Sequence, residues 1–157
     1  MQSKFVALST LVLAGASGPT YADRLPMPSD MSPAYRAECG ACHIPFPPAL
    51  LAPKDWIRVM EQLDRHYGVD ASLDETTRQH LRSFLERHGN PKRPAAPDAQ
   101  GLPRLTETTW FRRKHDEVPP RLWQDVRVKS RANCAACHRD AESGDFSEHR
   151  LRMPGLR

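Results

Sequence analysis

The feature that most constrains this chain is a pentapeptide, Cys-x-x-Cys-His, that occurs twice. The first copy occupies residues 39–43 and the second occupies residues 134–138. Side chains three positions apart lie on the same face of a helix. The two thiols of each copy can therefore each form a thioether with one vinyl group of a single haem, while the adjacent histidine reaches the iron. This spacing is the c-type haem attachment motif, and it predicts two covalently bound haem c groups.

The residues of the two motifs have two expected roles. The predicted covalent attachment points of the haem groups are Cys39, Cys42, Cys134 and Cys137. The predicted proximal ligands of the two irons are His43 and His138.

Two redox dithiols, two disulfides or one zinc site could also use four cysteines. A zinc site would take all four thiols and would leave the histidine after each pair unexplained. A thioredoxin-like dithiol needs a βαβ context, which the sequence lacks. A disulfide scaffold is the usual expectation for an exported chain. Both copies carry the histidine, which favours haem attachment over these three arrangements.

The composition provides few apolar side chains for a hydrophobic core. Hydrophobic residues make up 39% of the 157 residues, with two isoleucines and 15 prolines. Small domains bury too little apolar surface to be secure, and a haem supplies a large apolar body. The net charge is +4, with 27% charged residues of both signs. No basic stripe alternates with aromatic residues, so nucleic acid is not an expected partner.

Residues 1–22 have the pattern of a cleaved signal peptide. A short basic start precedes an apolar run over residues 5–16, and small residues precede Asp23. The run is well short of the ~20 residues that a membrane-spanning helix needs. No later segment is apolar enough to insert. We expect export to the periplasm and no transmembrane segment after cleavage.

Helix signals recur along the chain and no period-two run of β-branched residues is present. Ser32 and Pro33 favour a helix over residues 34–42, and residues 72–75 resemble a capping box for a helix that stops at Gly89. A further helix should begin at Pro53 and end at Gly68, with an apolar stripe of Trp56, Val59, Met60, Leu63, His66 and Tyr67. The fold class is therefore mostly α with extensive irregular chain, in two small haem-centred domains.

A proline-rich segment separates the two halves. Residues 90–103 contain four prolines and no apolar period, which is typical of a semi-rigid linker. In the second half we expect short helices near residues 106–114 and 122–126, and a helix from about residue 130 into the second motif. The predicted division is a signal peptide at 1–22, an N-terminal haem domain at 23–92, a Pro-rich linker at 93–103 and a C-terminal haem domain at 104–157.

The presence of a sixth ligand on each iron distinguishes an electron carrier from a ligand-binding or catalytic haem, which has an open position. For the first haem, His66 continues the apolar stripe and is preferred. His88 lies in the last turn before Gly89, where the helix dipole alone favours a histidine. His80 has polar neighbours and should be solvated.

For the second haem we prefer His115 over His149. His115 precedes the second motif by 19 residues, and the Pro119-Pro120 turn can fold its segment back over the haem. His149 can reach the iron only by a tight path. Met153 is a third candidate, because thioether ligation occurs in cytochromes c.

Aromatic and cationic residues complete the set of candidates. Trp56, Trp110 and Trp123 should pack on haem edges. A dense group of arginines and lysines between residues 112 and 131 either forms a solvated face or neutralises haem propionates.

The chain resembles the small periplasmic dihaem cytochromes c of bacteria. The segments that carry the resemblance are residues 39–43, 45–51, Trp56, 63–68, 70–74, 106–111, His115, 119–120, Trp123, 133–138 and 144–149. The resemblance implies two haem domains, bis-histidine ligation of both irons, and transfer of electrons to an oxygen-binding monohaem cytochrome c, often with a membrane b-type cytochrome. Its distal histidines should be among His66, His115 and His149. Met153 departs from the family pattern, which has an aliphatic residue there.

Together these features predict an electron-transfer protein and not an enzyme. It would be a monomer that passes electrons between a membrane, quinol-linked donor and a soluble haem protein. The alternative is a small dihaem oxidoreductase, peroxidase-like or reductase-like, with one five-coordinate haem.

Overall fold

The computed structural model describes residues 24–154, and the predicted signal peptide lies outside them. The α-helices are α1 (Pro33–Cys39), α2 (Pro53–Met60), α3 (Glu75–His88), α4 (Thr109–Lys114) and α5 (Pro120–Trp123). The short 3-10 helices are η2 (Pro48–Leu50), η3 (Leu63–Arg65), η4 (Leu105–Glu107), η5 (Cys134–Ala136), η6 (Ala141–Ser143) and η7 (Glu148–Arg150). Strand pairing within residues 24–154 is limited to isolated bridges. The predicted mostly α fold with much irregular chain is confirmed.

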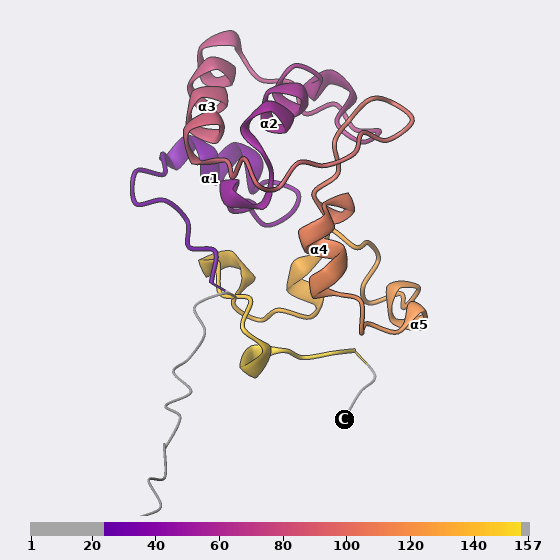
Figure 1. Cartoon of the computed structure of the whole chain (residues 1–157). Coiled ribbons are helices and arrows are strands. Elements are labelled where there is room, and N and C mark those ends of the chain that lie inside the picture. The colour runs from indigo at the N-terminus through magenta and orange to yellow at the C-terminus, as the bar shows by residue number, and fades with distance from the viewer. Residues whose placement is uncertain (1–23, 155–157) are drawn as a thin grey trace, which may run out of the picture.

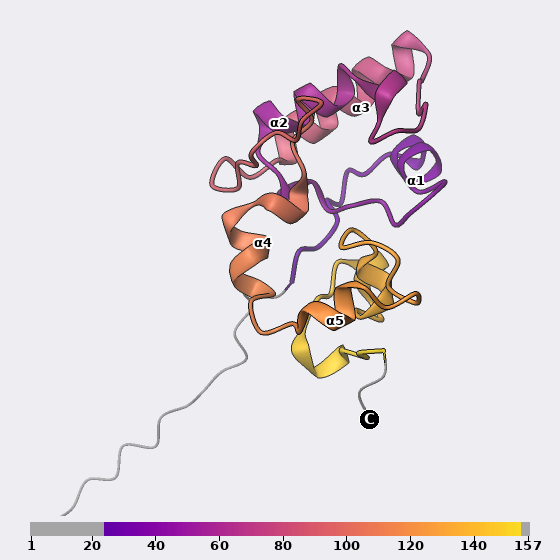
Figure 2. The same ribbon diagram turned by 90° about the vertical axis from the view of Figure 1, so that its right-hand side faces the viewer.

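The two halves of the chain lie at opposite ends of the molecule. Figures 1 and 2 show α1, α2 and α3 together at one end, and α5 with the yellow C-terminal segment at the other. The helix α4 runs along the side that joins them. None of the helices among residues 24–154 combines the length and apolar character required to cross a bilayer.

Helix α1 begins as the sequence predicts and ends earlier. The Ser32 hydroxyl accepts a hydrogen bond from the Tyr35 N–H at 3.2 Å, and Pro33 is the first helical residue. The helix stops at Cys39, with Gly40 as its C-cap, so the expectation that it continues to residue 42 is wrong. Glycine weakens a helix, and Pro45 can neither donate to Ala41 nor accommodate its carbonyl in a continued helix. Only the first cysteine of the motif is therefore helical.

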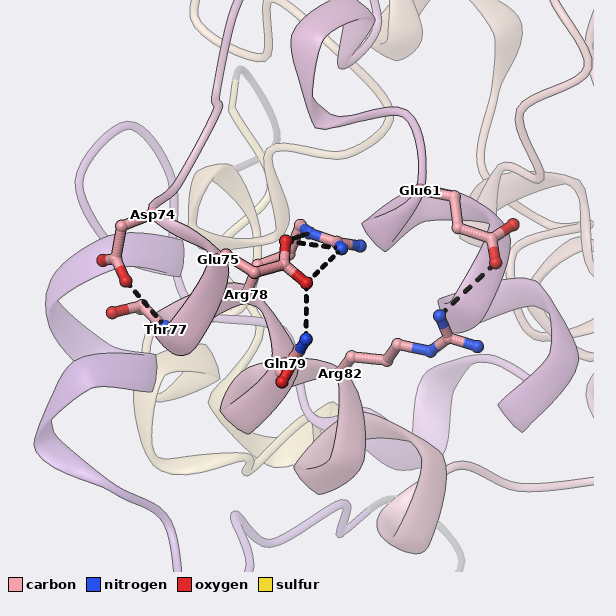
Figure 3. A network of polar contacts seen from close by, with 7 residues as sticks. All are labelled: Glu61, Asp74, Glu75, Thr77, Arg78, Gln79 and Arg82. Carbon is pink, nitrogen blue, oxygen red and sulfur yellow. Dashed lines mark hydrogen bonds and ion pairs between the residues drawn. The ribbon is translucent and has the colours of Figure 1, made fainter.

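Helices α2 and α3 pack side by side and form the main core. Trp56, Val59 and Met60 of α2 face Leu81, Phe84 and Leu85 of α3, and all six are buried. The Asp74 carboxylate caps α3 by accepting from the Thr77 N–H at 3.0 Å. Figure 3 shows this cap beside the Glu75–Arg78 pair, and the 3.5 Å ion pair by which Arg82 of α3 reaches Glu61 at the end of α2.

The apolar stripe of α2 is shorter than the sequence suggests. The helix ends at Met60, so the prediction of one helix up to Gly68 is wrong. The chain then forms η3 and turns sharply, with positive φ angles of 49° at Tyr67 and 95° at Gly68. The Ala71 N–H donates to the Leu63 carbonyl at 2.8 Å and closes the loop. The left-handed turn is favourable at Gly68, and it turns the chain back immediately after His66.

The 93–103 segment lies against the first half. The Ala95 N–H donates to the carboxylate of Asp55, which is fully buried in the first turn of α2, at 3.0 Å. The guanidinium of Arg93 donates to the Ala49 carbonyl at 2.8 Å and stacks over Trp110 at 3.9 Å. The division of the chain at this segment remains a prediction.

The second half contains shorter helices than the first. Thr108 caps α4 by accepting from the Phe111 N–H at 3.1 Å. The expected helix from about residue 130 is wrong, because residues 130–133 form turns and only η5 follows. The Leu25 N–H donates to the Gly144 carbonyl at 2.8 Å, so the start of the described chain is attached to this half.

Candidate haem-binding sites

The first candidate site is a cavity of about 620 Å³ between α1, α2 and the 63–71 loop. It is lined by Cys39 and Cys42 of the first motif, and by apolar side chains that include Trp56, Val59 and Met60. The imidazoles of His43 and His66 meet in it, with ring centroids 6.3 Å apart and planes inclined by 24°. The two histidines that the sequence pairs are therefore brought together here.

The two imidazoles of this pair differ in their surroundings, because a hydrogen bond holds the ring of His43, whereas the buried Nδ1 of His66 has no hydrogen-bond partner. The Nδ1 of His43 donates to the Ile44 carbonyl at 2.7 Å, and its ring stacks on Phe46 at 4.5 Å. In the neutral imidazole, a proton on Nδ1 means that Nε2 has a free lone pair, as a metal ligand requires. Burial lowers the pKa of His66, and the neighbouring His43 lowers it further. A neutral imidazole is the form that binds a metal.

The second candidate site brings His115 and His138 together. Their ring centroids are 6.1 Å apart and the planes are inclined by 80°. The Nδ1 of His115 donates to the Phe111 carbonyl at 2.9 Å. In the neutral imidazole, Nε2 then has no proton. Burial lowers the pKa of His115, although the bond to Phe111 acts in the opposite direction. Phe146 lies 5.2 Å from His138 on the other side.

Both pairs fit one iron atom each. A bond from a metal to an imidazole nitrogen is about 2 Å long, and the ring centroid lies roughly 1 Å behind that nitrogen, so two imidazoles on opposite sides of one metal have centroids about 6 Å apart. The observed separations are 6.3 Å and 6.1 Å. Each pair is thus spaced to ligate an iron between its two rings.

The four cysteines are unbridged. Burial raises the pKa of Cys39 to about 12 and that of Cys134 to about 11, and it also raises the pKa of Cys137. A redox dithiol or a catalytic cysteine needs a lowered pKa. Cys39, Cys134 and Cys137 are instead half-buried, whereas Cys42 is exposed.

The remaining histidines are His80, His88 and His149. His80 and His149 are exposed. His88 forms an ion pair with Asp30 at 2.9 Å, which agrees with its lower rank as a ligand. Met153, in the C-terminal segment, is partly buried.

Several contributors to the sites could not be identified from the sequence. The first cavity is closed partly by Leu105, Ser130 and Ala132 from the second half. Tyr67 next to His66 donates to the Pro103 carbonyl at 2.5 Å, and Arg104 stacks on its ring at 4.5 Å. These contacts join residues that are far apart in the chain, and no local motif marks them. Phe46 lies in the 45–51 segment that carries the family resemblance, but the sequence did not indicate that its ring stacks on His43.

The predicted tryptophans lie near the sites in different ways. Trp56 lines the first cavity and donates from Nε1 to the Pro48 carbonyl at 2.7 Å. Trp123 lies 5.9 Å from His115. Trp110 instead packs beneath the guanidinium of Arg93.

Comparison with known proteins agrees with this geometry. The family model of the dihaem cytochromes c matches residues 35–146. The chain belongs to the dihaem cytochrome c family. It therefore carries two covalently bound haem c groups and is an electron-transfer haem protein. The family, the fold class and the cofactors predicted from the sequence are confirmed, and the ligands and the acceptor that the resemblance implied stay predictions.

Three solved structures resemble the chain closely. The crystal structure of DHC purified from Rhodobacter sphaeroides is 43% identical and has a TM-score of 0.62, and the alignment covers 74% of this chain and 97% of that one. A second structure, of the dihaem cytochrome c from Rhodobacter sphaeroides, is 41% identical with a TM-score of 0.63 and covers 74% and 98%. The dihaem cytochrome c of Shewanella baltica OS155 is 34% identical with a TM-score of 0.69 and covers 79% and 94%. No curated protein matches the chain.

Proposed function

We propose that this dihaem cytochrome carries electrons from a membrane, quinol-linked donor to a soluble haem protein in the periplasm. Both irons are six-coordinate in this proposal. The first is ligated by His43 and His66, and the second by His138 and His115. A membrane b-type cytochrome is the donor, and a soluble monohaem cytochrome c is the acceptor.

The observation that carries the proposal is the occurrence of two facing imidazole pairs, at 6.3 Å and 6.1 Å. An iron with two protein ligands on its axis has no open position for a substrate. Such an iron can change its oxidation state with little change in its surroundings, which suits a carrier. An oxidoreductase would need one iron with an open position, and so one histidine of a pair that is not bound to it.

The protein residues have two tasks in this function. His43 and His115 donate their Nδ1 protons to the carbonyls of Ile44 and Phe111, which holds each ring in one orientation and tautomer. Apolar side chains such as Trp56 and Met60 exclude water from the first site, and the lower dielectric there favours the form of the iron site with less net charge. The c-type haem supplies the one-electron couple.

Periplasmic location belongs to the same proposal. The basic start, the short apolar run and the small-residue cleavage site of residues 1–22 support it. Attachment of haem to two Cys-x-x-Cys-His motifs also agrees with an exported protein.

The test is transfer of electrons through the holoprotein. Bacterial membranes that contain a b-type cytochrome are supplied with a quinol, and reduction of the added holoprotein is followed optically. A soluble monohaem cytochrome c is then added. The proposal predicts reduction by the membranes and reoxidation by the acceptor, without consumption of peroxide in a parallel assay. Rapid turnover of peroxide or of another small oxidant by the purified protein would support the enzyme alternative.

A further inference from the structure

Residues 121–131 of the second half contain Trp123 and several exposed basic side chains. We call this segment the 121–131 face, and its exposed or half-buried members are Arg121, Trp123, Val126, Arg127, Lys129 and Arg131. Val126 is 85% exposed and is one of two large hydrophobic side chains that stand out in the described chain. The acidic residue within this range, Asp125, is paired with Arg127 at 2.6 Å. The face therefore combines the exposed apolar side chain of Val126 with an excess of positive charge.

The backbone holds this face in one shape. The Asp125 carboxylate accepts from the Arg127 N–H at 2.9 Å, and the Asp125 carbonyl accepts from the N–H groups of Val128 and Lys129. Val128 is buried, with 2% of its surface exposed. Lys129 has the left-handed φ of 63°, which is rare for a residue with a side chain. Val126 thus lies, 85% exposed, in a loop that these hydrogen bonds order.

A continuous row of contacts connects this face to the second site. Arg131 lies over the Trp123 ring with its Cζ 5.3 Å from the ring centroid. Trp123 lies 5.9 Å from His115 and 6.3 Å from Phe111. One half-buried indole therefore separates the surface cation from the predicted distal ligand of the second haem.

We infer that the 121–131 face is the docking surface of an acidic, soluble electron-transfer protein that exchanges electrons with the second haem. This inference rests on the proposed carrier function and names the charge of one partner. Protein interfaces combine apolar and aromatic anchors with a polar rim, and Trp and Arg are enriched among their strongest contacts. Positive charge around the anchor steers an acidic partner to this point and accelerates association.

The experiment uses the holoprotein and an acidic flavodoxin as the probe. The rate of haem reduction by flavodoxin hydroquinone is measured over a range of ionic strength. Wild type is compared with the double variant K129E/R131E. The matched control is K54E/K92E, which makes the same change in net charge at exposed lysines of the first half. Amide shifts of ¹⁵N-labelled holoprotein on addition of oxidised flavodoxin give a readout that does not depend on electron transfer.

The inference predicts a rate for wild type that falls as salt increases. K129E/R131E should be slower by a factor on the order of ten at low salt, whereas K54E/K92E should stay within about twofold of wild type. The shifted amides should cluster at residues 121–131. Equal losses in both variants, or shifts clustered elsewhere, would overturn the inference.

Two further measurements test whether the same cations instead bind a membrane or act on the haem. Binding to vesicles of phosphatidylcholine and phosphatidylglycerol that is lost in K129E/R131E, with an unchanged flavodoxin rate, would show a membrane contact and overturn the inference. A slower rate in K129E/R131E that is fully accounted for by a shift in the midpoint potential, with unchanged amide shifts, would show that the cations act on the haem and not on docking, and would also overturn it. The failure of wild type to pass electrons to any soluble haem acceptor would instead contradict the carrier function itself.

Discussion

The imidazole of His115 lies almost flat on the ring of Phe111, with centroids 4.0 Å apart and planes inclined by 19°. Phe111 lies within α4 and His115 is the residue that caps its C-terminus, and the Phe111 carbonyl accepts the Nδ1 proton of the same imidazole. The ring is thus fixed by a stacked neighbour and by a hydrogen bond. Such orientation by a neighbouring group is typical of metal-ligating histidines.

Replacement of His115 by alanine should remove one ligand of the second iron. We expect the second haem to become high-spin, or to show a His/Met signal if Met153 takes the vacant position. His149 is exposed, so His149→Ala should keep the bis-histidine spectrum. Low-temperature magnetic resonance of the two oxidised variants distinguishes the cases. A loss of the spectrum in His149→Ala alone would reverse the assignment.

For the first haem, the matched pair is His66→Ala and His88→Ala. His66 faces His43 across the cavity, whereas His88 is paired with Asp30. We expect the first variant to make one haem high-spin and to leave the other unchanged, and the second variant to be silent in the optical spectrum. If His88→Ala altered the spectrum and His66→Ala did not, the pairing of His43 with His66 would be wrong.

The buried carboxylate of Asp55 should be important for stability. Its replacement by alanine removes the acceptor of the Ala95 N–H and leaves that donor buried. An unsatisfied buried group costs about 1–3 kcal/mol. The exposed Glu86→Ala on α3 is the control, with an expected change within about 0.5 kcal/mol. Denaturant unfolding of the holoproteins measures both, and equal stabilities would show that the tie between α2 and the 93–103 segment has no energetic importance.

Two glycines with similar backbone angles make a sharp comparison. Gly144 and Gly101 have φ angles of 75° and 84°. A Cβ at Gly144 would lie 2.2 Å from the Leu25 carbonyl oxygen, whereas a Cβ at Gly101 would meet nothing within 4 Å. Both alanine variants have backbone strain of roughly 1 kcal/mol, but Gly144→Ala must also displace the N-terminal segment. We expect a clearly larger fall in Tm for Gly144→Ala, and equal falls would contradict the observed contact.

The two motifs and their partner histidines could be predicted because their chemistry is local or restricted to a few candidates. Ser32 and Gly89 also marked helix ends correctly, since capping depends on neighbouring residues. The helical stripe that led to His66 was wrong beyond Met60, although His66 does face His43. The reason is that a left-handed turn at Tyr67 and Gly68 reverses the chain, and the helical period contains no information about such a turn.

Long-range packing could not be predicted from the sequence. The prolines between residues 90 and 103 suggested a linker, but the buried acceptor on Asp55 that holds Ala95 lies 40 residues away. The closure of the first cavity by Ser130 and Ala132 likewise depends on the tertiary arrangement. Turns and 3-10 helices around the second motif replaced the expected helix, because such short segments are stabilised by tertiary contacts more than by local propensity.

The central claim, two haem groups each held between two histidines, is tested most directly by low-temperature magnetic resonance of the oxidised holoprotein. Near-parallel imidazole planes split the iron orbitals strongly, whereas near-perpendicular planes leave two of them almost equal in energy. The plane angles are 24° for His43–His66 and 80° for His115–His138. Bis-histidine ligation at these angles therefore predicts two low-spin signals of equal intensity, one rhombic and one with a large principal g value. A high-spin signal of comparable intensity, or a single low-spin haem, would contradict it.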